Sequence, residues 1–169
     1  MIKLNTSSLA KGGILTALTC ILIYIGTIFP FNKIFILGIT STLVALGIIF
    51  EGNIKLGYSI FIASSILSFL LLGFKGMIFL YILFFGPYSL IKLYIEKLRK
   101  LPLEIFLKLC FFNLSLLICY WISKFVLIDI NLNNMPFPLP ILFIALQFVF
   151  LIYDYVLTLF VHTIYNKFF

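Results

Sequence analysis

Residues 34–50 read IFILGITSTLVALGIIF, a run without a charged side chain that is bounded by Lys33 and Glu51. A transmembrane helix needs about 20 apolar residues, with a range of about 17–25. The run lacks the alternation of apolar and polar residues that a barrel strand requires. Inside lipid a single segment must satisfy its own backbone groups, which a helix does. The run therefore predicts a membrane-spanning helix.

Similar apolar runs lie on both sides of this one. We expect six membrane spans, at residues 10–29, 34–50, 56–74, 77–94, 105–123 and 139–165. The fourth run contains Gly86 and Pro87, and proline removes a backbone donor and clashes one turn back, which predicts a kink. The sequence thus predicts an all-α integral membrane bundle of six transmembrane helices, forming a single transmembrane domain over residues 1–169.

The composition excludes the common soluble classes. Of the 169 residues, 64% are hydrophobic and 10% are charged, whereas soluble domains have about 45–50% and about 25%. This excludes an ordinary soluble enzyme, a disordered chain and a nucleic-acid module. The net charge of +7 does not indicate nucleic acid, because Lys and Arg stand at the ends of the apolar runs, where they set membrane orientation.

Six spans place both termini on one side of the membrane. With cytoplasmic termini, nine basic residues face the cytoplasm, namely Lys3, Lys11, Lys55, Lys92, Lys97, Arg99, Lys100, Lys108 and Lys167. Three face outward, namely Lys33, Lys75 and Lys124. The excess predicts cytoplasmic termini and a multi-pass protein of the cell membrane. The basic stretch from Lys92 to Lys108 fits this orientation. A coupling loop, or contact with anionic lipid headgroups, are the other interpretations.

No pattern of catalytic or metal-binding residues is present. The three cysteines lie inside apolar runs without C-x-x-C spacing, the chain has one histidine, and its five acidic residues are scattered. Nucleotide-binding, metalloprotease and serine-hydrolase motifs are missing. We therefore expect no catalytic residue, no metal site and no cofactor.

The first span has a stripe of small side chains. Ala10, Gly13 and Ala17, followed by Cys20, are spaced by three and four residues and so share one helix face. Small residues let two helices approach closely, which is a main source of helix packing in lipid. The stripe predicts contact either with another helix of the same chain or with a separate membrane subunit.

The sixth span has polar residues on one face, with Asn113 at similar depth on the fifth span. The set of intramembrane polar residues is Asn113, Gln147, Asp154, Thr158 and His162. Asp154 lies about 16 Å from the inner end, and an ionisable group at that depth needs a partner or a wet cavity. Asn113 could bond it and Lys108 could reach it. Asp154 is then either part of a proton relay or ligand site, or a strut that fixes helix register; His162 is interfacial.

Polar groups and aromatic rings also gather at the predicted outer ends of the spans. The candidate ligand-binding residues are Tyr24, Asn32, Lys33, Lys75, Tyr81, Tyr120, Trp121, Asn131, Asn133 and Asn134. Ligand sites combine apolar walls with a few polar groups, as these residues would. The alternative is that they are solvated turns and interfacial aromatics.

The first span carries a resemblance to a known family. Leu9-Ala10-x-x-Gly13-Ile14-Leu15-x-Ala17-Leu18 is similar to the first-helix docking motif in substrate-binding S components of energy-coupling factor (ECF) transporters, although alanine more commonly opens that motif. The size, the six spans and the cytoplasmic termini also resemble this family. The resemblance implies that Ala10, Gly13 and Ala17 contact a transmembrane coupling subunit. It also implies two cytoplasmic ATPases and a vitamin-like or metal solute as cargo.

Two other functions fit the same sequence. The size and span count resemble the small integral membrane protein of the bacterial rod-shape system, a non-enzymatic adaptor in cell elongation. The third interpretation is a proton- or ion-coupled carrier that uses Asp154.

Overall fold

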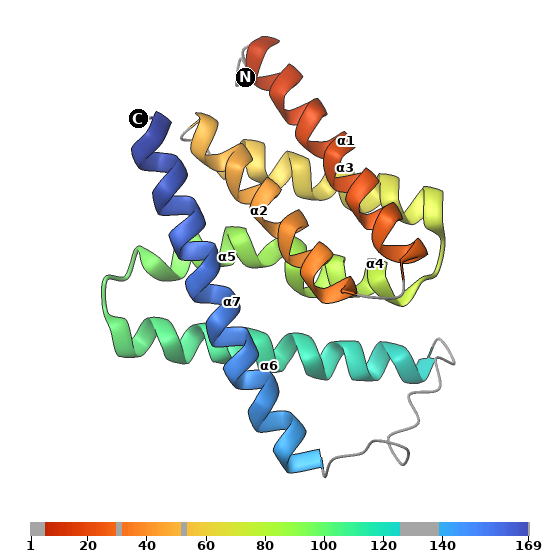
Figure 1. The fold of residues 1–169 in the computed structure, drawn as a ribbon, viewed down its shortest axis with the longest axis vertical. Helices are drawn as coiled ribbons and strands as arrows, with labels where there is room; N and C mark the ends of the chain where they lie inside the picture. Colours follow the sequence, from red (N-terminus) through yellow and green to blue (C-terminus); the bar gives the residue numbers. More distant parts are fainter. Residues whose placement is uncertain (1–5, 30–31, 52–53, 126–138, 169) are drawn as a thin grey trace. The chain divides into compact units, whose positions relative to one another are not determined.

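A computed structural model describes residues 6–29, 32–51, 54–125 and 139–168, and every regular element in these ranges is helical. The elements in chain order are α1 (Thr6–Ile28), α2 (Lys33–Glu51), α3 (Ile54–Leu72), α4 (Gly76–Leu80), the π-helical turn η1 (Tyr81–Phe85), α5 (Gly86–Glu96), α6 (Leu101–Phe125) and α7 (Leu139–Phe168). The helices α4, η1 and α5 follow one another without a break (Figure 1).

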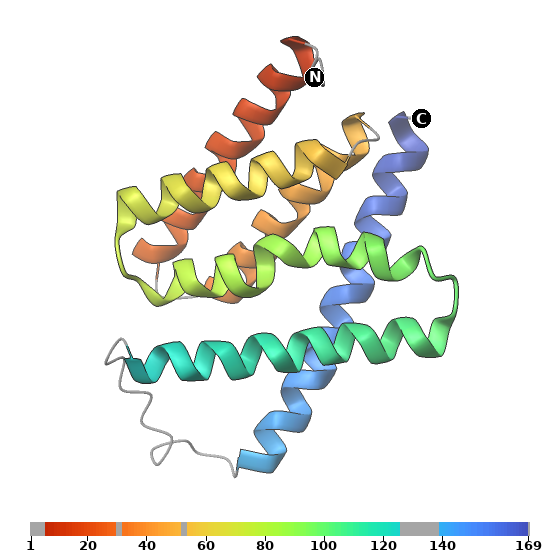
Figure 2. The same cartoon turned by 180° about the vertical axis from the view of Figure 1, so that it is seen from behind.

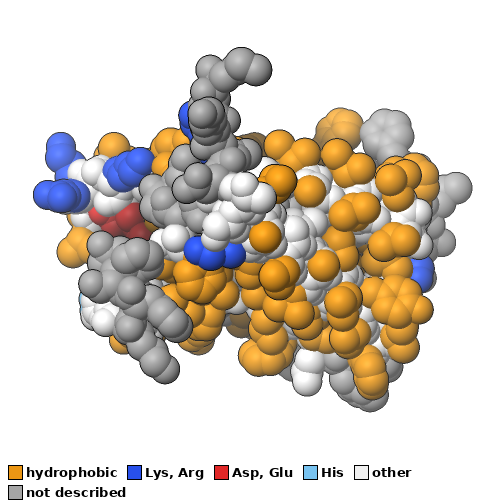
Figure 3. Space-filling view, turned by 90° about the horizontal axis from the view of Figure 1, so that it is seen from above, with side chains coloured by type: hydrophobic (Ala, Val, Ile, Leu, Met, Phe, Trp, Pro, Cys, Tyr) orange, Lys and Arg blue, Asp and Glu red, His pale blue; other side chains and the backbone are white. Residues whose placement is uncertain are grey.

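Six of these helical segments are long and apolar enough to cross a membrane. They are Thr6–Ile28, Lys33–Phe50, Ile54–Leu72, Gly76–Glu96, Leu101–Ile122 and Phe143–Ile164. Hydrophobic side chains cover much of the face drawn in Figure 3. The predicted all-α fold with six such segments is confirmed, and the length and composition of the segments are consistent with a multi-pass membrane protein.

Two helices begin earlier than the hydropathy pattern predicts. The first begins at Thr6 rather than Ala10, and the fifth apolar segment begins at Leu101 rather than Ile105. Pro102 is compatible with the first turn of a helix, where its missing N–H needs no partner. Glu104 in the same turn is favoured by the positive end of the helix dipole. The charged residues near position 100 therefore start α6 instead of interrupting the chain.

The chain packs as two compact units. The first, called unit 1, covers residues 1–99 and contains α1 to α5; the second, called unit 2, covers residues 100–169 and contains α6 and α7. Each unit is described below by itself.

Unit 1 has a core where α1, α2, α3 and α5 meet. Leu15, Val44, Ile60 and Leu90, one from each of these helices, are buried in a common hydrophobic cluster. The helices α1, α2 and α3 contact one another, and α5 packs against α2 and α3 (Figure 2). Burying these side chains together gives unit 1 its packing.

Glycine allows the close approach of helices in unit 1. A Cβ on Gly57 of α3 would collide with Ile48 of α2 and would lie 3.0 Å from Leu90 of α5. A Cβ on Gly86 would lie 2.5 Å from the ring of Phe61. These helix crossings therefore depend on the missing side chain, as small-residue packing in lipid requires.

A widened helical turn precedes Pro87. The amide of Gly86 donates to the carbonyl of Tyr81, five residues earlier, so the turn Tyr81–Phe85 is π-helical. Proline in a helix interior cannot donate and presses on the preceding turn, and an extra residue in that turn gives the ring room. The sequence predicts a kink at this point, and the structure shows a π-helical turn there.

Candidate functional site

The small-residue stripe of α1 faces away from the other helices of unit 1. Ala10, Gly13 and Ala17 are exposed, and a Cβ on Gly13 would have no atom within 4 Å. The opposite face, with Leu15 and Thr19, is buried against the bundle. Within unit 1 no described helix covers the stripe, so the same-chain interpretation finds no partner helix in this unit.

The stripe is shorter than the sequence pattern suggests. Cys20 is half-buried, and its thiol lies 3.8 Å from the carbonyl of Ser64 and 3.7 Å from the hydroxyl of Ser68, both on α3. Large apolar side chains border the exposed part, including Ile14, which is 69% exposed, and Leu9, which is 63% exposed. The exposed surface therefore combines a shallow strip of small residues with large apolar flanks.

One end of unit 1 brings together four of the candidate ligand-binding residues. A Cβ on Gly26 of α1 would lie 2.6 Å from Met77 of α4 and 3.2 Å from Ile36 of α2, so these three helices converge there. Tyr24 lies two residues before Gly26 on α1, Asn32 directly precedes α2, Lys33 begins α2, and Lys75 directly precedes α4. All four side chains are exposed. The convergence places the α1–α2 and α3–α4 connections and these polar groups at the same end.

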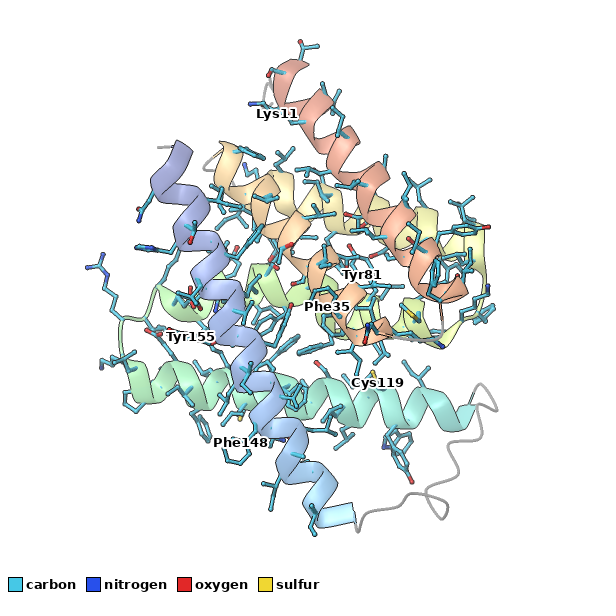
Figure 4. All side chains as sticks on the ribbon, in the orientation of Figure 1. Lys11, Phe35, Tyr81, Cys119, Phe148 and Tyr155 are labelled. Atoms are coloured by element: carbon cyan, nitrogen blue, oxygen red, sulfur yellow. The ribbon has the colours of Figure 1, made fainter. Side chains whose placement is uncertain are left out.

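Tyr81 is not part of that exposed end. Its side chain is fully buried, and its hydroxyl lies 2.6 Å from the hydroxyl of Ser64 (Figure 4). The cysteine and serine contacts described above continue this polar cluster toward α1. Buried hydroxyls paired in this way satisfy one another. Tyr81 therefore stabilises the junction of α1, α3 and the π turn.

A second polar cluster joins α6 and α7 in unit 2. The Lys108 ammonium nitrogen lies 2.8 Å from the Asp154 carboxylate, and their side chains are 7% and 15% exposed. One turn further, the rings of Phe112 and Phe150 stack with centroids 4.5 Å apart and planes 6° apart. From the ion pair to the ring stack the residue number increases on α6 and decreases on α7. The two helices are therefore antiparallel at this contact.

An amide pair continues the contact between α6 and α7. Gln147 donates through Nε2 to Oδ1 of Asn113 at 2.8 Å, and Nδ2 of Asn113 donates to the carbonyl of Leu109. The sequence suggests that Asn113 could bond Asp154, but the structure gives this role to Lys108. We call Lys108, Phe112, Asn113, Gln147, Phe150 and Asp154 together the α6–α7 seam. Paired contacts of this kind are what the strut interpretation of Asp154 predicts.

The remaining polar candidates on α6 and α7 are exposed. Thr158 donates to the carbonyl of Asp154 on its own helix, and His162 contacts Asn166 one turn away. Tyr120 and Trp121 are 42% and 61% exposed on α6. The last three candidates, Asn131, Asn133 and Asn134, lie outside the described residues.

Sequence reasoning missed two buried contacts. Ser41 and Ser89 bond side chain to side chain at 2.7 Å between α2 and α5. The Phe112–Phe150 stack was also missed, although Gln147, Phe150 and Asp154 are spaced by three and four residues, as one helix face requires. That spacing, read together with Lys108 and Phe112 one turn apart, is the signal that could have identified the seam.

The described residues contain no group of three or more His, Cys, Asp or Glu side chains that could hold a metal ion. Comparisons with protein-family models, with curated proteins and with solved structures found no match to this chain.

Proposed function

We propose that this protein is the membrane-embedded substrate-capture subunit of an ECF-type importer for a vitamin-like small solute. Its six apolar helices cross the cell membrane with both termini in the cytoplasm. The charge count favours this orientation even after two residues are removed from it. Lys92 and Lys108 are buried within α5 and α6, where they pair with Glu96 and Asp154. Without them, seven basic residues face the cytoplasm and three face outward.

The exposed stripe on α1 carries the proposal. Ala10, Gly13 and Ala17 leave a strip of backbone open to close approach, and unit 1 does not use it. In lipid, apolar surface alone gives two helices little reason to associate, whereas small residues add van der Waals contact at short range. A helix of a transmembrane coupling subunit fits this strip. Two cytoplasmic ATPases then supply the energy, because this chain has no nucleotide-binding motif.

The solute is captured at the opposite side from the termini. In the proposed orientation the outer end of unit 1 is the end where Tyr24, Asn32, Lys33 and Lys75 gather. An aromatic ring, an amide and two ammonium groups suit a small polar or anionic solute. Asn32 has a φ of 65°, a left-handed conformation that asparagine tolerates better than most residues, and it turns the chain directly into α2.

The stripe is tested by the double variant Gly13→Leu with Ala17→Leu. The leucines fill the strip, so we expect at least a tenfold loss of coupling subunit and ATPases recovered with the tagged chain from native membranes. Ala145→Leu is the matched control, because Ala145 is exposed on α7 and receives the same added side chain. It should recover the complex as the native chain does.

Two results would contradict the proposal. One is a native chain that recovers no ATPase-containing complex. The other is a double variant that recovers as much as the native chain. Recovery of cell-elongation proteins in place of ATPases, lost in the same double variant, would support the adaptor function instead, since an adaptor needs a docking strip as well.

A further inference from the structure

The turn between α5 and α6 is short and strongly basic. Its four residues are Lys97, Leu98, Arg99 and Lys100, and all four are exposed. The helix before it ends at Glu96 and the helix after it begins at Leu101. Both of these helices belong to segments long and apolar enough to cross a membrane. A connection this short stays close to the level at which the two spans leave the hydrocarbon.

Backbone hydrogen bonds define the shape of this turn. The amides of Leu98 and Arg99 donate to the carbonyls of Ile95 and Glu96 at 3.0 and 3.4 Å. Arg99 then adopts a left-handed backbone with a φ of 53°, which ends the helix. The three basic side chains are therefore carried on four consecutive residues.

Glu96, the acidic residue directly before the turn in sequence, forms its ion pair with a residue outside the turn. Glu96 pairs with Lys92 at 2.9 Å, and Lys92 is only 3% exposed. The Lys97 ammonium lies 5.3 Å above the ring of Tyr94, a cation–π contact that leaves its charge in place. Among the described residues no ion pair joins Lys97, Arg99 or Lys100 to an acidic side chain. The turn therefore presents three positive charges.

Apolar side chains flank these charges at the surface. Tyr94 is 49% exposed, Leu98 is 47% exposed and Leu101 is 74% exposed. Tyrosine and basic residues side by side are typical of the membrane–water interface, and exposed leucines there contact the upper acyl chains. Basic side chains gather at one edge of the face drawn in Figure 3, beside acidic side chains and hydrophobic surface.

We propose that residues 94–101 form a binding surface for the headgroups of anionic phospholipids. Arg99 donates two parallel hydrogen bonds to the phosphate, as a guanidinium does. Lys97 and Lys100 add positive charge, and the leucines contact the glycerol and upper acyl region. This inference does not depend on the transport proposal, since a lipid-bound turn is compatible with any of the functions considered above.

The test compares lipid retention by three forms of the full chain. Each is reconstituted in nanodiscs of equal parts phosphatidylcholine and phosphatidylglycerol, and native mass spectrometry counts the lipids that stay bound. The turn variant is Lys97→Gln with Arg99→Gln. The matched control is Lys11→Gln with Lys55→Gln, which removes the same charge from exposed positions elsewhere.

We expect the native chain and the control to retain phosphatidylglycerol in preference to phosphatidylcholine. Each basic residue near a charged membrane contributes about fivefold to such binding, so the turn variant should lose at least about tenfold of this preference. Added salt should weaken the preference in the native chain. Inorganic phosphate at matched ionic strength should weaken it no further, because it lacks the apolar part of the lipid.

Three results would overturn the proposal. The turn variant could retain the native preference, the two variants could lose it equally, or inorganic phosphate could displace the lipid in excess of the ionic-strength effect. The second result would assign lipid preference to net charge alone. A turn variant with native lipid preference that loses an acidic protein partner would assign the surface to that protein.

Discussion

Unit 1 and unit 2 hold their helices together by different interactions. In unit 1, glycine allows close packing and buried hydroxyls pair with one another, so shape dominates. In unit 2 the seam between α6 and α7 contains an ion pair, a ring stack and an amide pair. Lipid provides little hydrophobic drive for helix association. Two other interactions can take the place of this hydrophobic drive. Unit 1 uses close van der Waals contact, and unit 2 uses specific polar contact.

Among the variants proposed here, breaking the Lys108–Asp154 ion pair should cause the largest loss of stability. Replacing Asp154 with leucine leaves the Lys108 ammonium in a site where its side chain is 7% exposed. Removing one member of a buried pair costs about 3–5 kcal/mol, so unit 2 should unfold at a lower denaturant concentration. Trp121 is the one tryptophan of the chain and lies on α6, so its fluorescence during titration with dodecyl sulfate reports the loss.

The double variant Lys108→Met with Asp154→Leu separates charge from packing. A well-packed hydrophobic pair often matches or exceeds the stability of a buried ion pair. We expect the double variant to recover most of the stability that the single variant loses. A double variant as unstable as the single one would mean that the unpaired Lys108 charge does not cause the loss, and the ion-pair explanation would then fail.

Filling a glycine contact should have the next largest effect, this time in unit 1. Gly57→Val places methyl groups against Ile48 and Leu90, and overpacking of this kind costs about 1–3 kcal/mol. Gly13→Val is the control on α1, where a Cβ meets no atom within 4 Å, and its cost should be under about 0.5 kcal/mol. Thermal unfolding followed by circular dichroism measures both. Equal losses would show that shape does not dominate unit 1.

Composition and hydropathy were sufficient to predict the helices, because the requirement for about 20 apolar residues leaves little freedom in where a span lies. The ends were less predictable. The charges near Leu101 obscure a helix start that Pro102 and Glu104 support. Helix ends depend on local capping and dipole effects, which an average over an apolar run does not contain.

The partners within the candidate site were less predictable than the residues themselves. A helical wheel groups Gln147, Asp154, Thr158 and His162 on one face. In the structure the first two bond side chains of α6, and the last two bond residues of α7. One helix alone contains no information about where its neighbour crosses it. The same reason explains Tyr81, whose ring turns inward to Ser64 even though aromatic residues near a predicted span end suggest an exposed belt.

Variants of the Asn113–Gln147 amide pair should cause the smallest loss of stability. The loss should differ between the two residues. Interhelical hydrogen bonds in membranes contribute about 0.6 kcal/mol on average. Gln147→Leu removes one such bond together with Oε1, a buried atom without a partner among the described residues, so its cost should be near zero. Asn113→Leu leaves the whole Gln147 amide unpaired, so its cost should be larger, about 1 kcal/mol or more. The Trp121 titration compares the two variants, and a larger loss for Gln147→Leu would show that Oε1 has a partner in the membrane.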